Sequence, residues 1–380
     1  MNRVFEYRLY PSKTQKRRLQ SVLETCRRFY NALLAERRDA WEQQQRSVGK
    51  FEQLREVKVF KKTNPYAADI HSHVLQLVVV RLDLAFQAFF RRVKAGEKPG
   101  YPRFKGRDRF SSFGFKEYGN GFRLDGRRLK LSGVGRVAVR WHRALPCAPK
   151  TVRIARRADG WYAMFTCRVD ATPLPNTGKD VDVDVGITAL IATSDGEKVP
   201  NPKWYRLAQK RLRRKQRRVS RRQKNGSNRR KAVREVAALG LRVSRQPKDA
   251  INKIVRSLVD RYDFIAVEDL QIQSMVKNRR LSTSIMDSGW GYFGQRLHAK
   301  AAEAERVVVE VNPAYARQTC SVCHQRFQQP AKLSARTVSC SCGMAMDRDV
   351  NAAANILWLG RSHWALTPTV AEVAQEAAGL

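Results

Sequence analysis

The segment DVDVDVGITALIATSDGEKVP, residues 180–200, decides the fold of the second half of the chain. Acids and valines alternate over its first residues, which predicts a strand, and Asp195–Gly196 predicts a turn into a second strand. The apolar runs in RYDFIAVEDL (261–270) and RVVVEV (306–311) are typical of buried strands. Helices are expected at 204–258, at 288–304 with Asp287 as the cap, and in DRDVNAAANILWLG at 347–360. Strands that alternate with helices predict an α/β domain.

The first half begins with a different pattern. Residues 3–10 are expected to form a strand, and Ser12 with Gln15 gives the capping box of a helix whose apolar face includes Cys26, taken as a core residue. Further helix is predicted at about 66–94, and antiparallel strands at 121–170 with hairpin turns at Asp125–Gly126 and Asp159–Gly160. We therefore predict one β-domain interrupted by a helical one, closed by the linker ATPLPNTGK (171–179).

Composition narrows the class of protein. The 380 residues include 74 Lys and Arg against 34 Asp and Glu, a formal charge of +40, while 43% are hydrophobic. Such a charge favours a polyanionic partner, because self-repulsion otherwise destabilises the folded chain. The most apolar run, VLQLVVVRLDLAFQAFF, is interrupted by Gln76, Arg81 and Asp83, so no membrane-spanning helix is expected. The N-terminus lacks the apolar region of a signal peptide, and seven cysteines do not predict a disulfide framework.

Two basic segments are candidates for nucleic-acid contact. In KPGYPRFKGRDRFSSFGF (98–115), stacking faces and cations alternate; the alternative is an edge strand whose aromatics face a core. The residues concerned are Tyr101, Phe104, Phe110, Phe113, Phe115, Lys98, Arg103, Lys105, Arg107 and Arg109. Between residues 206 and 234 stand fifteen Lys and Arg and no acid, which favours phosphate contact over a solvated face.

Four late cysteines predict a structural zinc site. Cys320 and Cys323 are separated by two residues, and Cys340 and Cys342 by one, where a zinc ribbon usually has two. Two close pairs can supply four thiolates to a tetrahedral ion and leave no open position for catalysis. The alternatives are reduced free cysteines, or His324 in place of one ligand. Cys147 and Cys167 have no partner at such a spacing and are expected to be structural.

The acids in strand positions predict a second metal site. Asp182 and Asp184 share one face of a strand, Glu268 ends the strand FIAV, and Asp349 begins a helix. Carboxylates in such positions are costly without a cation, and three of them could hold two Mg²⁺ ions that act on a phosphodiester. Separately, Asp349 could be a helix N-cap, Glu268 an exposed strand-end acid, and Asp182 and Asp184 acids beside a turn.

Several ordered motifs resemble the TnpB (OrfB-type) proteins of insertion sequences, relatives of the miniature type V CRISPR effector nucleases. The resemblance covers almost the whole chain. Its motifs are RLYPSKTQ (8–15), GYPRFKGR (100–107), VDVGI (183–187), VEDL (267–270), DSGWGYF (287–293), the TCSVC…SCSCG insert and DRDVNAAANI (347–356). It implies Asp184, Glu268 and Asp349 as the catalytic, metal-binding residues. Asp182 stands where the family usually has Gly, and is either an extra ligand or an outward-facing bystander.

The resemblance also implies a multidomain α/β fold, with an RNase H-like RuvC nuclease domain that carries a zinc-finger insert. The expected parts are a wedge-like β-barrel (1–11 and 97–172), a helical recognition domain (12–96), a linker (173–178), the RuvC domain (179–314 and 344–360), the insert (315–343) and a tail (361–380).

What such a protein would do follows from the family. It would be an RNA-guided DNA endonuclease with two Mg²⁺ ions (or Mn²⁺), a structural Zn²⁺, a guide RNA from the element's own end and double-stranded target DNA. It would act in the prokaryotic cytoplasm at the nucleoid, without a membrane, as a monomer or weak dimer. Contacts to nucleic acid are expected from Tyr101, Arg103, Phe104, Lys105, Arg107, Arg211, Arg214, Arg218 and Arg222. A guided regulator that does not cut, and a transposase that joins DNA ends, remain alternatives.

Overall fold

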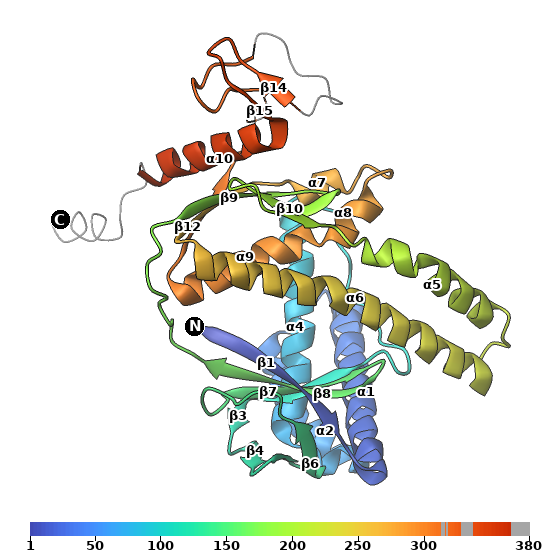
Figure 1. The fold of residues 1–380 in the computed structure, drawn as a ribbon. Coiled ribbons are helices and arrows are strands. Elements are labelled where there is room, and N and C mark those ends of the chain that lie inside the picture. The colour runs from blue at the N-terminus through green and yellow to red at the C-terminus, as the bar shows by residue number, and fades with distance from the viewer. Residues whose placement is uncertain (313–315, 317, 328–336, 366–380) are drawn as a thin grey trace. The chain divides into compact units, whose positions relative to one another are not determined.

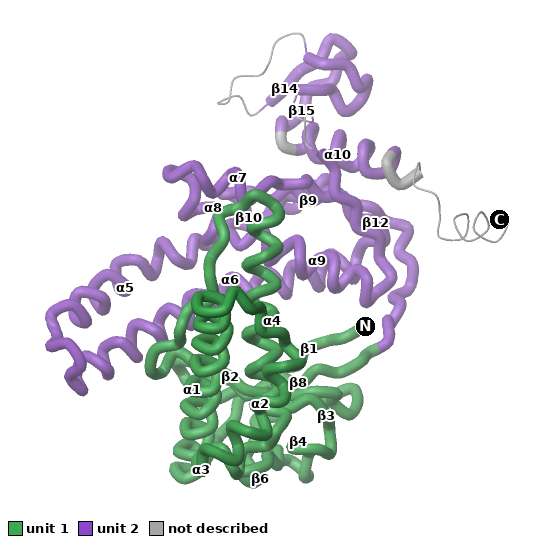
Figure 2. Tube along the Cα trace, turned by 180° about the vertical axis from the view of Figure 1, so that it is seen from behind, with its two compact units in different colours: residues 1–169 green, residues 170–380 purple. Residues whose placement is uncertain are grey.

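The computed structural model describes residues 1–312, 316, 318–327 and 337–365, and divides into two compact units. Unit 1 is Met1–Val169 and unit 2 is Asp170–Leu380 (Figure 2). Of the predicted insert, residues 328–336 lie outside the described residues, as does the predicted tail from residue 366 onward. Each unit is therefore described by itself.

Unit 1 is built on an eight-stranded sheet with the order β2-β7-β8-β1-β6-β5-β4-β3. Its strands are β1 (Asn2–Tyr10), β2 (Ser112–Phe115), β3 (Glu117–Tyr118), β4 (Gly121–Asp125), β5 (Arg128–Leu131), β6 (Gly135–Arg140), β7 (Thr151–Arg157) and β8 (Gly160–Arg168). The first strand pairs antiparallel with both β6 and β8. The antiparallel pairs β4–β5 and β7–β8 confirm the two predicted hairpins.

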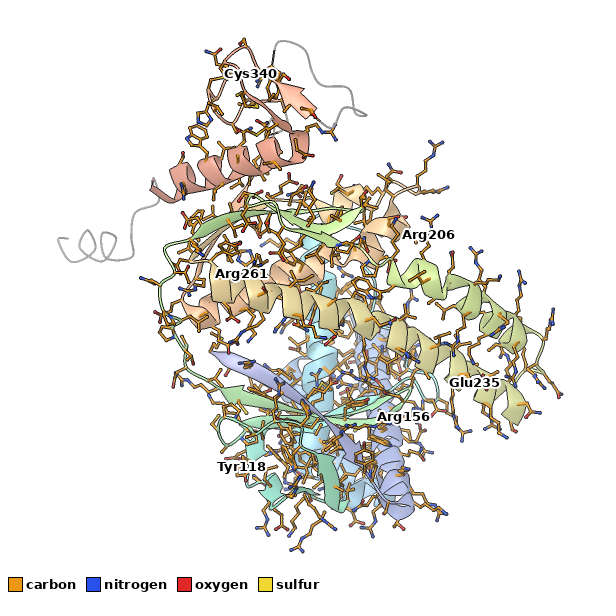
Figure 3. The ribbon with its side chains drawn as sticks, viewed as in Figure 1. Tyr118, Arg156, Arg206, Glu235, Arg261 and Cys340 are labelled. Atoms are coloured by element: carbon orange, nitrogen blue, oxygen red, sulfur yellow. The ribbon has the colours of Figure 1, made fainter. Side chains whose placement is uncertain are left out.

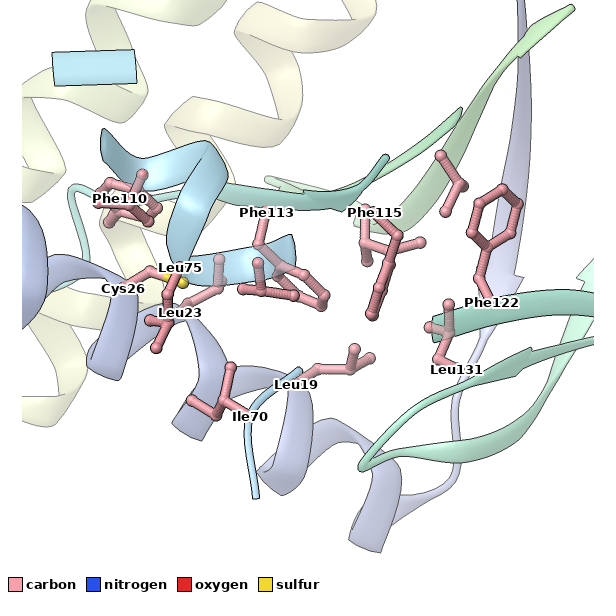
Figure 4. Packing of buried hydrophobic residues seen from close by; sticks show 14 of the residues in the cluster. Leu19, Leu23, Cys26, Ile70, Leu75, Phe110, Phe113, Phe115, Phe122 and Leu131 are labelled. Atoms are coloured by element: carbon pink, nitrogen blue, oxygen red, sulfur yellow. The ribbon is translucent and has the colours of Figure 1, made fainter. Parts of the chain in front are cut away.

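Four helices lie between β1 and β2 in the sequence: α1 (Lys13–Gln44), α2 (Lys50–Thr63), α3 (Pro65–Ala68) and α4 (Ser72–Lys94). The capping box is confirmed, because the Gln15 amide N–H donates to the Ser12 hydroxyl while the Ser12 N–H donates to Oε1 of Gln15. Cys26 is completely buried in the core that these helices share with the sheet, as predicted (Figure 4). Burial raises the pKa of its thiol to about 12.

Helix α4 corrects the argument about membranes. By length and apolar composition it could cross a membrane, the one such helix in the part of the chain that the structure describes. The interruptions at Arg81 and Asp83 therefore do not exclude a span by composition. In unit 1, however, its apolar face is buried in the core, Arg81 donates to the Ser112 hydroxyl, and Asp83 pairs with Arg37. The helix is thus packed as a core helix.

Unit 2 contains a five-stranded sheet with the order β11-β10-β9-β12-β13. Its strands are β9 (Asp180–Val185), β10 (Ala189–Thr193), β11 (Lys198–Pro200), β12 (Phe264–Glu268) and β13 (Val307–Val311). The strands β9, β10 and β11 pair antiparallel, whereas β9, β12 and β13 pair parallel. The segment 180–200 thus forms three strands, not two. The additional turn needs Gly186, because a Cβ there would stand 2.9 Å from the carbonyl oxygen of Ala189.

Helices cover both faces of this sheet (Figure 1). On one face, α6 (Ser227–Arg261) and α9 (Trp290–Ala304) pack on Val181, Val183 and Ile265. On the other face, α10 (Arg348–Ala365) packs on Phe264 and Ala266. The remaining elements are α5 (Trp204–Ser220), α7 (Ile272–Met275), α8 (Ser282–Ser288) and the hairpin of β14 (Thr337–Ser339) with β15 (Ala345–Asp347).

The predicted role of Asp287 is wrong. The residue lies inside α8, and α9 begins only after Gly289, whose φ of 71° separates the two helices. Its carboxylate instead accepts hydrogen bonds from the backbone N–H groups of Tyr205 (2.8 Å) and Arg206 (3.4 Å). These groups are in the first turn of α5, which has no side-chain cap of its own, so Asp287 satisfies donors that are distant in sequence.

Candidate active site

The central strand β9 presents its acids to α10. Its valines pack in the core on the side of α6 and α9, so Asp180, Asp182 and Asp184 face the opposite side. Asp180 forms an ion pair with Arg361 of α10 at 2.6 Å, which confirms that this face lies under the helix. The sequence prediction that Asp182 and Asp184 share one face is therefore correct.

The neighbouring strand brings Glu268 to the same place. Phe264 and Ala266 pack toward α10, so Glu268, two residues further, points to the same face. The parallel register pairs Ala266 with Asp182 and Val267 with Val183, which puts Glu268 opposite Asp184. Adjacent strands are about 4.8 Å apart, so the two acids are neighbours at the carboxyl ends of the strands. Glu268 is partly buried, so it is not a fully exposed strand-end acid.

Asp349 lies in the first turn of α10; its side chain is outside the described residues. The helix starts near the carboxyl end of β9: Asp347, the residue before it, lies 3.9 Å from Lys198, which the register places next to Ala192, the partner of Asp184. Arg361, near the end of the helix, pairs with Asp180 at the start of β9. Twelve residues of helix cover about 18 Å, and the four residues from Asp180 to Asp184 cover about 13 Å. The first turn of α10 therefore lies over the end of the sheet that carries Asp184 and Glu268.

The alternative that Asp349 is the N-cap of this helix is not supported. Asp347, at the end of β15, takes that role: its Oδ1 accepts a hydrogen bond of 3.3 Å from the backbone N–H of Val350.

Asp182 is the most unusual acid of the group. It is completely buried, and within the described part of the chain neither carboxylate oxygen has a hydrogen-bond partner. Burial raises its pKa well above the ordinary value, and the charges of Asp184 and Glu268 raise it further. The reading of Asp182 as an outward-facing bystander is thus wrong, because the residue points into the acidic face between the sheet and α10.

The four cysteines come together as a metal site. Their sulfur atoms all lie within 4.8 Å of one another, and they are the one group of that kind among the described residues. The Sγ atoms of Cys320 and Cys342 are 3.7 Å apart, and those of Cys323 and Cys340 are 3.6 Å apart. A tetrahedron of Zn–S bonds of 2.3 Å requires about 3.8 Å. The donor set and its spacing therefore fit zinc, and the shorter Cys340–Cys342 pair does not prevent it.

Local backbone geometry supports this site. Gly343 has a φ of 90° and donates its N–H to the carbonyl of Cys340, which closes the second knuckle. The backbone N–H of Cys342 lowers the pKa of Cys340 to about 6, whereas burial and hydrogen bonds from the neighbouring thiols raise the pKa of Cys323 and of Cys342. One thiol of the group is therefore readily ionised, and a bound cation would be needed to ionise the others. His324 is not a ligand here, because its ring stacks on Trp358 of α10 at 4.1 Å. All seven cysteines are free of disulfides in this structure.

Sequence reasoning did not single out two asparagines of α10. Asn351 and Asn355 are buried, and their amides bond to backbone atoms around Cys320. A signal was available: two asparagines four residues apart in a helix interior are unfavourable unless their side chains have partners.

The segment 98–115 divides into two parts. Phe110, Phe113 and Phe115 are buried in the core of unit 1 (Figure 4), so the alternative that aromatics of this segment face a core is correct for them. Tyr101 and Phe104 are almost half exposed, although the ring of Tyr101 meets Phe86 and Phe89 edge-on and Phe104 lies under Arg38.

The cations of this segment also differ. Arg103 and Arg107 are exposed. Lys105 is partly buried: its backbone N–H donates to Asn31, its carbonyl accepts from Arg27 and Asn31, and its ammonium lies over the ring of Tyr30. Arg103 and Arg107 are therefore better placed than Lys105 to meet a phosphate.

The second basic segment forms a helical hairpin. Helices α5 and α6 pack together, and side chains of both helices project from the hairpin into solvent (Figure 3). Arg211, Arg214 and Arg222 are exposed, whereas Arg218 lies 3.4 Å from Glu235, which Lys215 approaches more closely at 2.7 Å. Between residues 206 and 234 the hairpin thus offers a high density of cations, of which Lys215 and Arg218 contact Glu235.

Three family descriptions match the sequence. Residues 164–279 match OrfB_IS605, "Probable transposase"; residues 290–356 match "Cas12f1-like, TNB domain"; and residues 1–46 match a "Helix-turn-helix domain". In the structure, residues 1–46 hold β1 and the single long helix α1, so no helix-turn-helix stands in that range.

Two relatives match over nearly the whole chain. A protein of Streptomyces pristinaespiralis named "Putative RNA-guided DNA endonuclease" is 34% identical over 369 residues, covering 95% of this chain and 90% of its own. The Escherichia coli K12 protein "Putative RNA-guided DNA endonuclease InsQ" is 27% identical over 380 residues, covering 94% and 92%. The fold resembles a chain in a Cas12f1–sgRNA–target DNA complex, with a TM-score of 0.56, 10% identity, and coverage of 94% and 98%.

Proposed function

This chain belongs to the TnpB family of insertion-sequence proteins, related to the miniature type V effectors, and we propose from that membership what it does. It is an RNA-guided DNA endonuclease encoded by an insertion sequence, and its partners are RNA and DNA. One observation carries the proposal: a relative named as an RNA-guided DNA endonuclease matches over nearly the whole chain.

The nuclease part would be an RNase H-like RuvC domain. The sheet of unit 2 has the order β11-β10-β9-β12-β13. Its first three strands in the sequence pair antiparallel, and β12 and β13 run parallel to β9. That order, with helices on both faces, supports the domain boundaries at 179–314 and 344–360 with a zinc-finger insert between them. In unit 1, the sheet with its helical insertion supports a wedge-like domain (1–11 and 97–172) around a recognition domain (12–96).

Asp184, Glu268 and Asp349 would hold the catalytic metal. The donors fit Mg²⁺ or Mn²⁺, because they are all carboxylates and the neighbouring Asp182 has buried oxygens that no group among the described residues satisfies. Two bound ions would supply an activated water and charge stabilisation of the leaving oxygen. The chain's own contribution is to fix two acids on adjacent parallel strands and the third on the helix above them.

Sequence specificity would come from pairing between guide and target, so the protein needs to hold backbone and to read one short motif. The exposed cations of the α5–α6 hairpin would contact phosphates, and Arg103 and Arg107 would lie near the motif reader in unit 1. The guide RNA would come from the element's own end, with the protein acting in the prokaryotic cytoplasm as a monomer or weak dimer.

The test is cleavage of guided duplex DNA by the purified protein–RNA complex with Mg²⁺. Asp184→Ala, Glu268→Ala and Asp349→Ala should each lower the cleavage rate by about 10³-fold or more, with guide and target binding nearly unchanged. Asp182→Ala, on the same strand face, is the matched control and should retain substantial activity.

The same assay separates the alternatives. A guided regulator would bind the target and leave it intact, and a transposase would give joined DNA products. An inactive Asp182→Ala beside an active Asp184→Ala would contradict the register of β9 proposed for the site.

A further inference from the structure

Asn351 and Asn355 connect the helix of Asp349 to the zinc site. They are four residues apart on one face of α10, and their exposed fractions are 0% and 3%. Buried amides are retained in a helix only where their hydrogen-bonding groups find partners. Both partners here lie outside the helix, in the first cysteine knuckle.

The contacts are specific. Oδ1 of Asn351 accepts from the backbone N–H of Ser321 at 2.9 Å, and its Nδ2 donates to the carbonyl oxygen of Thr319 at 2.7 Å. Nδ2 of Asn355 donates to the same carbonyl at 2.6 Å and to that of Ala316 at 2.9 Å. The side chain of Asn351 therefore holds the backbone on both sides of Cys320, and the side chain of Asn355 adds a second hydrogen bond to the carbonyl of Thr319.

Cys320 is the buried ligand of the cysteine site. It is completely inaccessible to solvent, its N–H donates to the carbonyl of Gln325, and its carbonyl accepts from the N–H of His324. A shift of Thr319 or Ser321 would therefore move a zinc ligand that has little room to adjust. The stack of His324 on Trp358 adds a contact one helical turn beyond Asn355.

At its other end the connection reaches the acidic centre. Asn351 follows Asp349 by two residues, within the first turn of α10. From Cys320 to the backbone of Asp349 there is thus a short path: one peptide group, one buried amide and two helical residues. Such a path can carry a displacement, because it consists of packed and hydrogen-bonded groups throughout.

We propose that Asn351 and Asn355 are positioning residues that fix the zinc knuckle to α10, so that zinc occupancy sets the place of Asp349 in the acidic centre. This inference rests on the proposed function, since it assigns Asp349 to the metal site. Zinc then strengthens divalent metal binding at the acids, and by linkage the acids' metal strengthens zinc binding by the same factor.

The coupling can be measured without cleavage. Binding of Mn²⁺ to the full chain is followed by calorimetry or electron paramagnetic resonance, with zinc present and after its removal by a chelator. Mn²⁺ prefers oxygen ligands, so emptied thiols do not compete, and Asp184→Ala defines the signal of the acidic centre. In the unsubstituted protein, zinc removal should weaken Mn²⁺ binding about tenfold, the effect of a few neutral hydrogen bonds.

Asn355→Leu keeps the volume of the side chain and removes its hydrogen-bond donors. With zinc present it should lower the affinity for Mn²⁺, and zinc removal should then change that affinity less than twofold. It should also speed zinc release to the chelator about tenfold. Asn252→Leu is the matched control: its amide in α6 bonds to Tyr292 and Arg296 and is remote in sequence from the knuckle. It should leave the tenfold effect of zinc on Mn²⁺ affinity intact. A general loss of stability would instead reduce this effect in both Asn355→Leu and Asn252→Leu.

A second variant protects the test against a folding failure. Trp358 is 47% exposed, so Trp358→Ala should fold and should reduce the zinc effect by two- to threefold through loss of the His324 stack. A full zinc effect on Mn²⁺ affinity in both Asn355→Leu and Trp358→Ala would overturn the inference. Coupling without guided cleavage by the unsubstituted protein would instead leave the inference standing and refute the proposed function.

Discussion

Replacing Asp182 by Asn should make the metal-free protein more stable. The side chain is completely buried on the face between β9 and α10, and both of its oxygens lack hydrogen-bond partners among the residues that the structure describes. A carboxylate in that position costs several kcal/mol even after relaxation of its surroundings. Asn has nearly the same shape without the charge, so the substitution removes the electrostatic cost and keeps the packing.

The expected size follows from two opposing contributions. The unsatisfied amide of Asn costs about 1–3 kcal/mol, less than the several kcal/mol of the charge, which leaves a net gain of about 2 kcal/mol at pH 8. For a unit of this size the melting temperature rises by about 2–4 °C per kcal/mol, so the gain corresponds to roughly 4–8 °C.

The sign of the pH dependence is fixed by the raised pKa of Asp182. Below the unfolded-state value of about 3.9 the carboxyl is neutral in both states and no cost exists. As the pH rises above it, the unfolded chain releases the proton while the folded chain retains it, so the unsubstituted protein loses stability until its folded pKa is passed. The advantage of Asp182→Asn should therefore be absent near pH 4 and largest at pH 8.

Thermal unfolding by circular dichroism checks this, on zinc-loaded protein with no other divalent cation. Adding Mg²⁺ at pH 8 should narrow the difference, because a cation at the neighbouring acids offsets the buried charge. Asp180→Asn, which breaks the ion pair with Arg361 on the same strand face, is the control and should lower stability instead. Equal melting temperatures for Asp182→Asn and the unsubstituted protein at pH 8, or an equal advantage at pH 4, would refute the reasoning.

Three further predictions concern zinc and nucleic acid. Elemental analysis should find about one zinc per chain, lost in Cys320→Ser and Cys340→Ser and kept when Cys26, Cys147 or Cys167 is replaced by Ala; a folded, active, zinc-free preparation would contradict the site. Charge reversal at four positions of the α5–α6 hairpin should reduce the slope of log affinity for RNA against log salt by about 2–4, since each lost phosphate contact contributes roughly 0.7–0.9. The four positions are Arg211, Arg214, Arg218 and Arg222. An unchanged slope would show that these side chains only face solvent. Arg103→Ala should reduce guided cleavage at an unchanged melting temperature, with a smaller effect for Lys105→Ala, and full cleavage by both variants would remove the segment from the recognition surface.

Local patterns predicted the secondary structure correctly where a turn or a helix cap depends on residues that are close in sequence. The capping box at Ser12 and the two Asp–Gly hairpins were confirmed, because turn and cap chemistry acts within four residues. Asp287 was misplaced, since the N–H groups that it caps belong to a helix more than eighty residues earlier. The turn at Gly186 was missed because the carbonyl that requires glycine there comes from the strand that the turn itself creates.

The acidic site was predictable in part. Alternation along β9 gave the shared face of Asp182 and Asp184, but the position of Glu268 beside them depends on a parallel register between strands separated by two helices. Burial of Asp182 could not be read from alternation, because α10, which covers that face, is brought there by a segment more than 160 residues later in the sequence. The asparagines that join α10 to the cysteine knuckle escaped notice for the same reason.

The segment 98–115 shows why composition alone does not identify a binding surface. Its aromatics and cations interleave throughout, yet Phe110 is 4% exposed while Phe104 is 46% exposed. This difference in exposure follows from the sheet. The segment continues into β2 at Ser112, and the residues nearest to that strand pack in the core beside α1 and α4. Residues before it form neither strand nor helix, and only there do an exposed ring and an exposed guanidinium, as in Phe104 and Arg103, remain together for a nucleic acid to meet.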